Sequence, residues 1–109
     1  MVDVLGPHHH AAFLAYRVRL AHAQQVRHAT DEDLDHVETL LAELRALPQL
    51  RERKRGYFSR GSRAFVHFHE DVGDFFVDVR LDDKFERMKV TTGDEQAEFL
   101  NRVRMALGP

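Results

Sequence analysis

The spacing of apolar residues changes twice along this chain, and that change constrains the fold more than any other feature. From residue 56 to residue 90 apolar side chains recur at every second position, which is typical of strands with one buried face. On both sides of this stretch the period is close to 3.6, which is typical of amphipathic helices. The order predicts an α+β fold: two N-terminal helices, a four-stranded antiparallel meander sheet and one C-terminal helix (α-α-β-β-β-β-α).

Three helices are predicted, each with a recognisable first turn. The first begins near Pro7, a residue favoured at the first helical position. The second begins after Thr30, whose side chain can cap free N–H groups, and ends at Pro48. The third begins at Thr92, with Glu95 at the spacing of a capping box. Their apolar faces comprise, in turn, Phe13, Leu14, Val18 and Ala21; Leu34, Val37, Leu40, Leu41, Leu44 and Leu47; and Phe99, Leu100, Val103 and Leu107.

Four strands are predicted over residues 56–59, 63–69, 75–81 and 85–90. The connections between them are three to five residues long and rich in Gly and Asp, so neighbouring strands must run antiparallel. A chain of 109 residues is too short for two independent cores, which predicts a single domain over residues 1–109.

Alternation along these strands separates two faces. The face expected to pack against the helices carries Ala64, Val66, Phe68, Phe75, Val77, Val79, Leu81, Met88 and Val90. The second face mixes aromatic and ionic side chains, and it is the predicted binding surface: Phe58, Phe65, His67, His69, Phe76, Asp78, Arg80 and Arg87.

The turn between the second and third strands predicts their register. A four-residue loop over residues 71–74 keeps both apolar sets on one side of the sheet. His67 then faces Asp78, and Phe65 faces Arg80, which predicts a His–Asp hydrogen bond and a cation–π contact. The next turn places Asp78 opposite either Arg87 or Lys89.

Composition excludes several classes of protein. The absence of cysteine excludes disulfide scaffolds, thiolate metal sites and a cysteine nucleophile. No apolar run is long enough to span a bilayer, so no membrane association is expected. The N-terminus lacks the pattern of a secretory signal, which predicts a cytoplasmic location.

The leading hypothesis is a non-enzymatic binding module that self-associates, most simply as a homodimer. Phe58, Phe65 and Phe76 would form an apolar patch among ionic groups, and such patches are usually covered. A second subunit, a small-molecule ligand or a helix of the same chain are the candidates. This hypothesis requires no cofactor and assigns no catalytic residue.

An alternative is a small metal-binding protein or acid/base enzyme centred on His67, His69 and Asp78. Two imidazoles two residues apart on a strand share one face and can share one ion. A third ligand would come from Asp78, Glu70 or the run His8–His10. A hydrolase with a covalent intermediate is disfavoured, because the two serines, Ser59 and Ser62, flank a turn away from His67. A structural His67–Asp78 ion pair is the simpler alternative to acid/base catalysis. The other histidines, His22, His28 and His36, are predicted to face solvent on or near helices.

A second alternative is single-stranded nucleic-acid binding through the basic segment of residues 51–63. Six basic residues there are interleaved with Tyr57 and Phe58, and aromatic rings beside basic groups can stack bases. The net charge of -2 and the acidic hairpin that follows would repel phosphates, so nucleic acid is an unlikely partner. A solvated loop is the simpler interpretation of this segment.

Residues 56–58, 64–71, 78–80 and 85–87 together resemble small bacterial proteins of no assigned activity. The order of helices followed by a meander also resembles the layout of YjbR-like proteins. This resemblance implies the α+β layout, and no functional residue is carried over from it.

Overall fold

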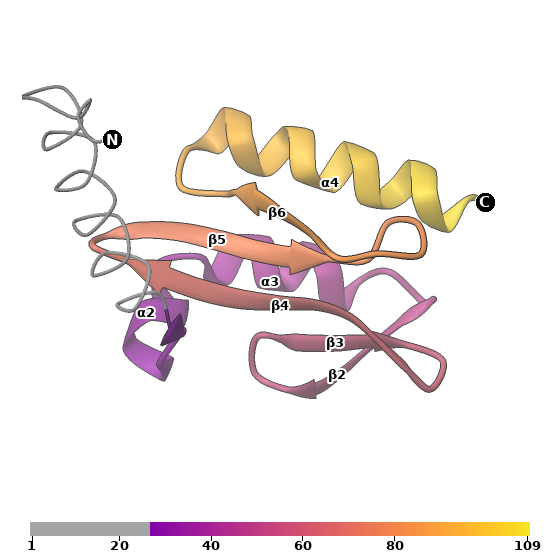
Figure 1. Cartoon of the computed structure of the whole chain (residues 1–109), viewed down its shortest axis with the longest axis horizontal. Helices are drawn as coiled ribbons and strands as arrows, with labels where there is room; N and C mark the ends of the chain where they lie inside the picture. Colours follow the sequence, from indigo (N-terminus) through magenta and orange to yellow (C-terminus); the bar gives the residue numbers. More distant parts are fainter. Residues whose placement is uncertain (1–26) are drawn as a thin grey trace, which may run out of the picture.

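The computed structural model describes residues 27–109, which form an α+β fold with an antiparallel sheet (Figure 1). The predicted helix that begins near Pro7 lies outside the described residues. The elements are β1 (Arg27–His28), α2 (Asp31–Asp35), α3 (Glu38–Arg45), β2 (Leu50–Lys54), β3 (Tyr57–Arg60), β4 (Arg63–Asp71), β5 (Asp74–Val79), β6 (Glu86–Lys89) and α4 (Gly93–Leu107).

The helix predicted after Thr30 is divided in two. Thr30 caps it as expected, in a capping box with Asp33. The chain then tightens, because the N–H groups of His36 and Val37 bond to carbonyls three residues back, and α3 begins afresh at Glu38. The break leaves the predicted apolar face buried through both helices: Leu34, Val37, Leu40, Leu41 and Leu44.

The last helix, α4, matches its prediction. The Thr92 hydroxyl accepts from the N–H of Glu95, and the Glu95 carboxylate accepts from the N–H of Thr92. Gly108, with a φ of 73°, follows the last turn. None of the helices within residues 27–109 has both the length and the apolarity needed to cross a bilayer.

The sheet is larger than predicted, with six strands instead of four. Its main path is β2-β3-β4-β5-β6, and β1 pairs with β4. β4 is nine residues long, and two different strands pair with different parts of one of its edges. β3 pairs with it from Arg63 to His67, and β1 pairs with His69 and Glu70.

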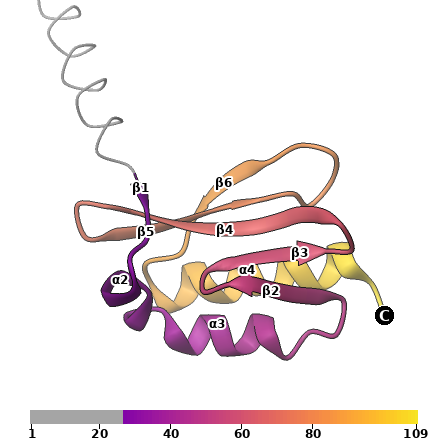
Figure 2. The ribbon, with the colours of Figure 1, turned by 90° about the horizontal axis from the view of Figure 1, so that it is seen from below.

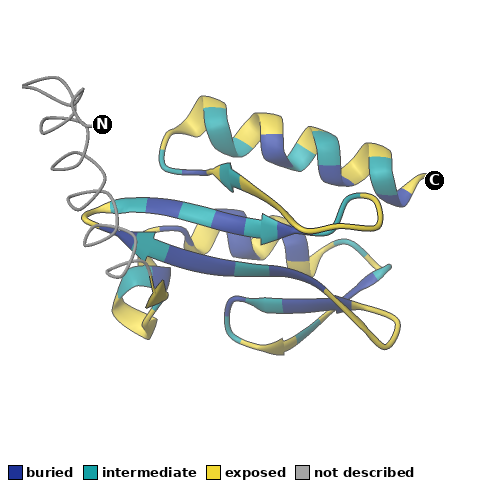
Figure 3. Ribbon diagram, viewed as in Figure 1, coloured by how far each residue is buried: buried dark blue, intermediate teal, exposed yellow. Residues whose placement is uncertain are grey.

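Strand parity decides which side of the sheet is buried, and the prediction for the helix-facing side is confirmed in the middle of the sheet. Residues of β5 alternate between half-buried and buried (Figure 3). The helices α3 and α4 lie together on one face (Figure 2). The core between them includes Val66, Phe68, Phe75, Val77, Val79, Val90, Phe99 and Val103. Leu81 and Met88 are only partly buried, and Ala64 is exposed.

The prediction of a loop between the second helix and the sheet is wrong for residues 50–54. They form β2, which pairs antiparallel with β3. Only Leu50 of this strand is buried, and its other side chains are charged. Charged residues on an edge strand prevent pairing with another chain, but they also remove the alternation by which a strand is recognised.

Candidate functional site

The second face of the sheet is organised around Asp78. The predicted register is confirmed: His67 pairs with Asp78, His69 with Phe76 and Glu70 with Phe75. On the other side Asp78 pairs with Arg87, which decides between the two cations that the sequence left open. Asp78 accepts two hydrogen bonds from Arg87, from Nε at 2.8 Å and Nη2 at 2.9 Å.

The histidine bonded to Asp78 is His69, not His67 as predicted. His69 Nε2 lies 2.9 Å from Asp78 Oδ2. The Cα register of His67 with Asp78 was correct, but diagonal neighbours on one face of a sheet are within reach of long side chains. His69 is 7% exposed, so this bond lies in a largely water-excluded part of the face.

A third histidine, His28, joins His67 and His69. It lies on β1, directly opposite His69, and its ring stacks on the His69 ring at a centroid distance of 4.9 Å. Ring nitrogens of the three residues, one from each, all lie within 4.8 Å of one another. His28 is exposed, as predicted, but it lies on a strand beside two other histidines, which the sequence did not predict.

The His67 and His69 rings hold unused ring nitrogens. Nδ1 of each is buried and has no hydrogen-bond partner within residues 27–109. Burial lowers the pKa of both imidazoles, and the effect outweighs the attraction of Asp78. Hydrogen bonding from Arg87 is the main reason that the pKa of Asp78 is also lowered. Near neutral pH the site therefore contains two neutral imidazoles beside an ionised carboxylate.

Aromatic rings border this three-histidine cluster. Tyr57 stacks on His67 with the ring planes 9° apart, and Phe85 contacts His67 edge-on at 5.4 Å. The Lys54 ammonium lies over the Tyr57 ring, 4.5 Å from its centroid. A pocket of about 220 Å³ adjoins His67 and Tyr57; its other lining residues are Arg53, Phe58, Ser59, Ser62, Ala64 and Val66.

Two of the predicted surface phenylalanines are in the core instead. Phe58 pairs with Val66 and is 2% exposed, so the expectation that it joins the second face is wrong. Tyr57 takes that place. Phe65 is 3% exposed and lies at a register shift, where Phe58 pairs with Val66 and Ser59 with Ala64, leaving Phe65 unmatched on β3. Alternation fails at such a bulge, and Phe65 and Val66 are both buried.

The predicted cation–π contact has a different ring. The N–H of Arg80 donates to the Phe65 carbonyl at 2.8 Å, which confirms their pairing. The guanidinium of Arg80, however, lies over Phe85, 4.4 Å from the ring centroid. Phe76 is half-buried on the second face beside His69, as expected. The apolar patch on this face is consequently smaller than predicted.

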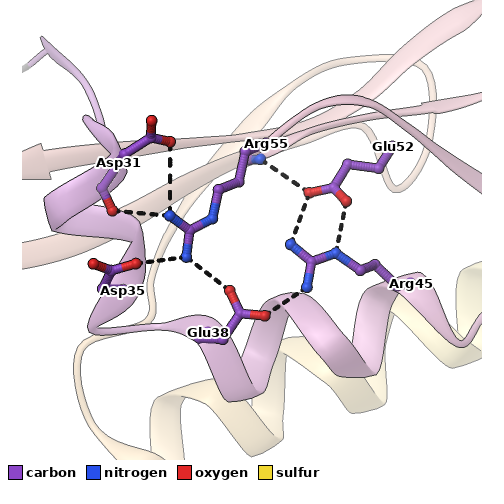
Figure 4. Close-up of polar contacts among 7 residues, drawn as sticks. Asp31, Asp35, Glu38, Arg45, Glu52 and Arg55 are labelled. Carbon is purple, nitrogen blue, oxygen red and sulfur yellow. Dashed lines mark hydrogen bonds and ion pairs between the residues drawn. The ribbon is translucent and has the colours of Figure 1, made fainter.

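The charge of the basic segment (residues 51–63) is partly neutralised, in part by acidic residues that precede it in the chain. Arg55 binds Asp35 and Glu38 at 2.8 Å, and Arg45 binds Glu38 and Glu52 (Figure 4). These contacts join α2, α3 and β2, so Arg55 has a structural role. They weaken the hypothesis that residues 51–63 bind the phosphates of a nucleic acid.

Comparison with protein-family models, curated proteins and solved structures finds no match for this chain. The resemblance to YjbR-like proteins stays a prediction.

Proposed function

We propose that the protein binds a divalent transition-metal ion through His28, His67 and His69. The observation that carries the proposal is the convergence of three imidazoles in which two buried Nδ1 atoms have no hydrogen-bond partner among the described residues. A buried polar atom without a partner is costly, and a metal ion would satisfy both at once.

The donor set favours ions of the zinc, copper and nickel type. Neutral imidazole nitrogen suits these ions, whereas calcium and magnesium prefer oxygen. Three imidazoles would leave a fourth position for water or another ligand. In a tetrahedral zinc site, ligand nitrogens lie about 3.3 Å apart, given Zn–N distances of about 2.0–2.1 Å. Two nitrogens at the 4.8 Å limit would therefore have to approach by more than 1 Å, and the exposed His28 is the member with room to move.

Asp78 would orient one of the ligands. Because Nε2 of His69 donates to Asp78, Nδ1 of that ring is left as the lone-pair nitrogen. Carboxylates hold metal-binding histidines in this way in many sites. Arg87 favours the ionised form of Asp78, which is the form that accepts this bond.

Metal binding now has more support than the interaction module that the sequence favoured. The module depended on three surface phenylalanines, of which the structure leaves Phe76 on the second face. The metal hypothesis left its third ligand open between Asp78, Glu70 and the run His8–His10, and His28 offers a ring nitrogen in their place.

Zinc titration by calorimetry tests the proposal. The run His8–His10 lies outside the described residues and can itself bind metal, so it is replaced by alanine in every protein compared. We expect one equivalent of zinc per chain. We also expect a tetrahedral cobalt(II) absorption spectrum in the same protein, and at least tenfold weaker zinc binding in each of H28Q, H67Q and H69Q.

His36→Gln is the matched control, because His36 contacts Phe75 and lies outside the cluster. Its zinc affinity should stay within twofold of the parent protein. Zinc binding that survives all three cluster substitutions, or that falls equally in H36Q, would refute the proposal. Far-ultraviolet circular dichroism of each metal-free variant confirms that it is folded.

A further inference from the structure

A second concave site lies at the end of the β3–β4 hairpin, and its wall is made of arginines. The hollow has a volume of about 100 Å³ and is lined by Arg60, Arg63, Ala64, Phe65, Arg80, Leu81 and Asp82. Three arginines and one aspartate therefore line a hollow whose other lining residues are apolar. The metal site lies farther along β4, at His67 and His69.

These three arginines differ from most others in the structure. Arg27, Arg45, Arg55, Arg87, Arg102 and Arg104 each form an ion pair with a carboxylate. Arg60, Arg63 and Arg80 form none within residues 27–109. Arg60 and Arg63 are also direct partners across the hairpin, an arrangement in which like charges destabilise a sheet.

Arg80 is held in place without losing its charge. Its Nε donates to the Ala64 carbonyl at 3.1 Å, its Nη1 donates to the Asp83 carbonyl at 3.5 Å, and its guanidinium lies over the Phe85 ring. A cation positioned by a carbonyl and an aromatic face keeps its full charge for a ligand. It also loses little conformational freedom on binding.

We infer that this arginine hollow binds a compact oxyanion, a phosphate group above all. Arginine forks match the geometry of phosphate, so Arg60 and Arg63 can donate two hydrogen bonds each, while Arg80 contributes its charge. The hollow offers about 100 Å³, several times the roughly 10–15 Å³ that a single water requires by the same measure, so a compact oxyanion can enter it. The group can be free phosphate or the terminal phosphate of a larger molecule that extends into solvent.

The test measures binding of inorganic phosphate by amide chemical-shift titration of the full chain. A chelator and constant ionic strength keep the metal site and general screening out of the result, so failure here leaves the metal proposal untouched. We expect saturable shifts at residues 60–65 and 80–82, with at least fivefold weaker binding in R60Q and in R63Q.

Arg51→Gln is the matched control. Arg51 lies on β2, forms no ion pair in the described part of the chain, and does not line the hollow. Phosphate affinity within twofold of wild type in R51Q supports a localised site. Equal weakening in R51Q, or shifts that do not saturate, would overturn the inference in favour of a diffuse basic surface.

Two further titrations distinguish the source of the phosphate. Tighter binding of adenosine monophosphate than of inorganic phosphate, with adenosine inactive, indicates the terminal group of a larger ligand. Equal affinities indicate free phosphate. Binding of a single-stranded oligonucleotide that depends on Arg51 as strongly as on Arg63 would count against the hollow as a discrete site.

Discussion

Replacing Asp78 with asparagine separates its two roles, because asparagine keeps the volume and one acceptor oxygen but removes the charge. Asp78 bonds to His69 on one side and to Arg87 on the other. The two side chains of the first pair are 8% and 19% exposed, whereas Arg87 is 47% exposed. The two contacts should therefore contribute unequally to stability.

The magnitude follows from that difference in exposure. A hydrogen bond to a charged group contributes about 1.5–3 kcal/mol when it is shielded from water. A solvent-exposed ion pair contributes about 1 kcal/mol at most. Since asparagine retains one acceptor, D78N should lower the free energy of unfolding by about 2 kcal/mol, and R87Q by less than about 1 kcal/mol. Asp83→Asn, on an exposed turn, should change it by less than about 0.5 kcal/mol.

Urea unfolding of the metal-free proteins, followed by circular dichroism, gives these values, and zinc titration gives a second readout. Loss of the carboxylate behind a metal-binding histidine costs about 10–100-fold in affinity, so D78N should show that loss while D83N does not. If R87Q costs as much stability as D78N, the Arg87 pair is the dominant contact and the argument from burial is wrong. If D78N binds zinc like wild type, Asp78 does not orient a ligand.

Three further predictions concern pH, the core and self-association. Burial lowers the pKa of His67 and His69 below the ordinary 6.5, so the unfolded chain binds more protons below that pH. The free energy of unfolding of the chelator-treated protein should reach its full value above pH 6.5. Below that pH it should fall by up to about 1.4 kcal/mol per pH unit for each histidine, and urea unfolding of H67Q/H69Q should show a smaller slope. Phe99→Ala, at a fully buried position, should cost about 3–5 kcal/mol in the same assay, whereas M105A, at a position 75% exposed, should cost less than about 0.5 kcal/mol. If the second face mediates a homodimer, light scattering should give twice the chain mass for wild type and the chain mass for F76E/F85E; a monomeric wild type would contradict that hypothesis.

The sequence was most informative where one side of a strand is apolar and the other ionic. A one-residue slip between β4 and β5 would bury Asp78 and expose Val77, so the alternation and the loop length together determine the register. The caps at Thr30 and Thr92 were equally readable, because capping depends on residues within one turn.

Short elements with adjacent aromatic residues could not be assigned in this way. β3 has four residues, and Tyr57 and Phe58 are both large and apolar enough to occupy either face. Phe58 is buried, and Tyr57, which carries a polar hydroxyl, lies beside the histidines. The alternation of apolar residues alone does not show which of the two rings is buried. The bulge beside Phe65 is set by pairing with β3, which no local pattern in β4 reveals.

The missed histidine shows how a site can depend on contacts between distant segments. β1 has two residues, too few for any periodicity, and it is held beside β4 by its flanks. Arg27 bonds to Asp33 and to Glu70, and the N–H of Ala29 donates to the Phe68 carbonyl. Asp33 is also the acid of the Thr30 capping box, so the start of α2 and the pairing of β1 share one carboxylate. His28 lies between these anchors, and its position next to His69 follows from them. The third histidine of the cluster is thus positioned by a helix cap and by two ion pairs of Arg27. The acidic partners of Arg27 lie six and 43 residues farther along the chain.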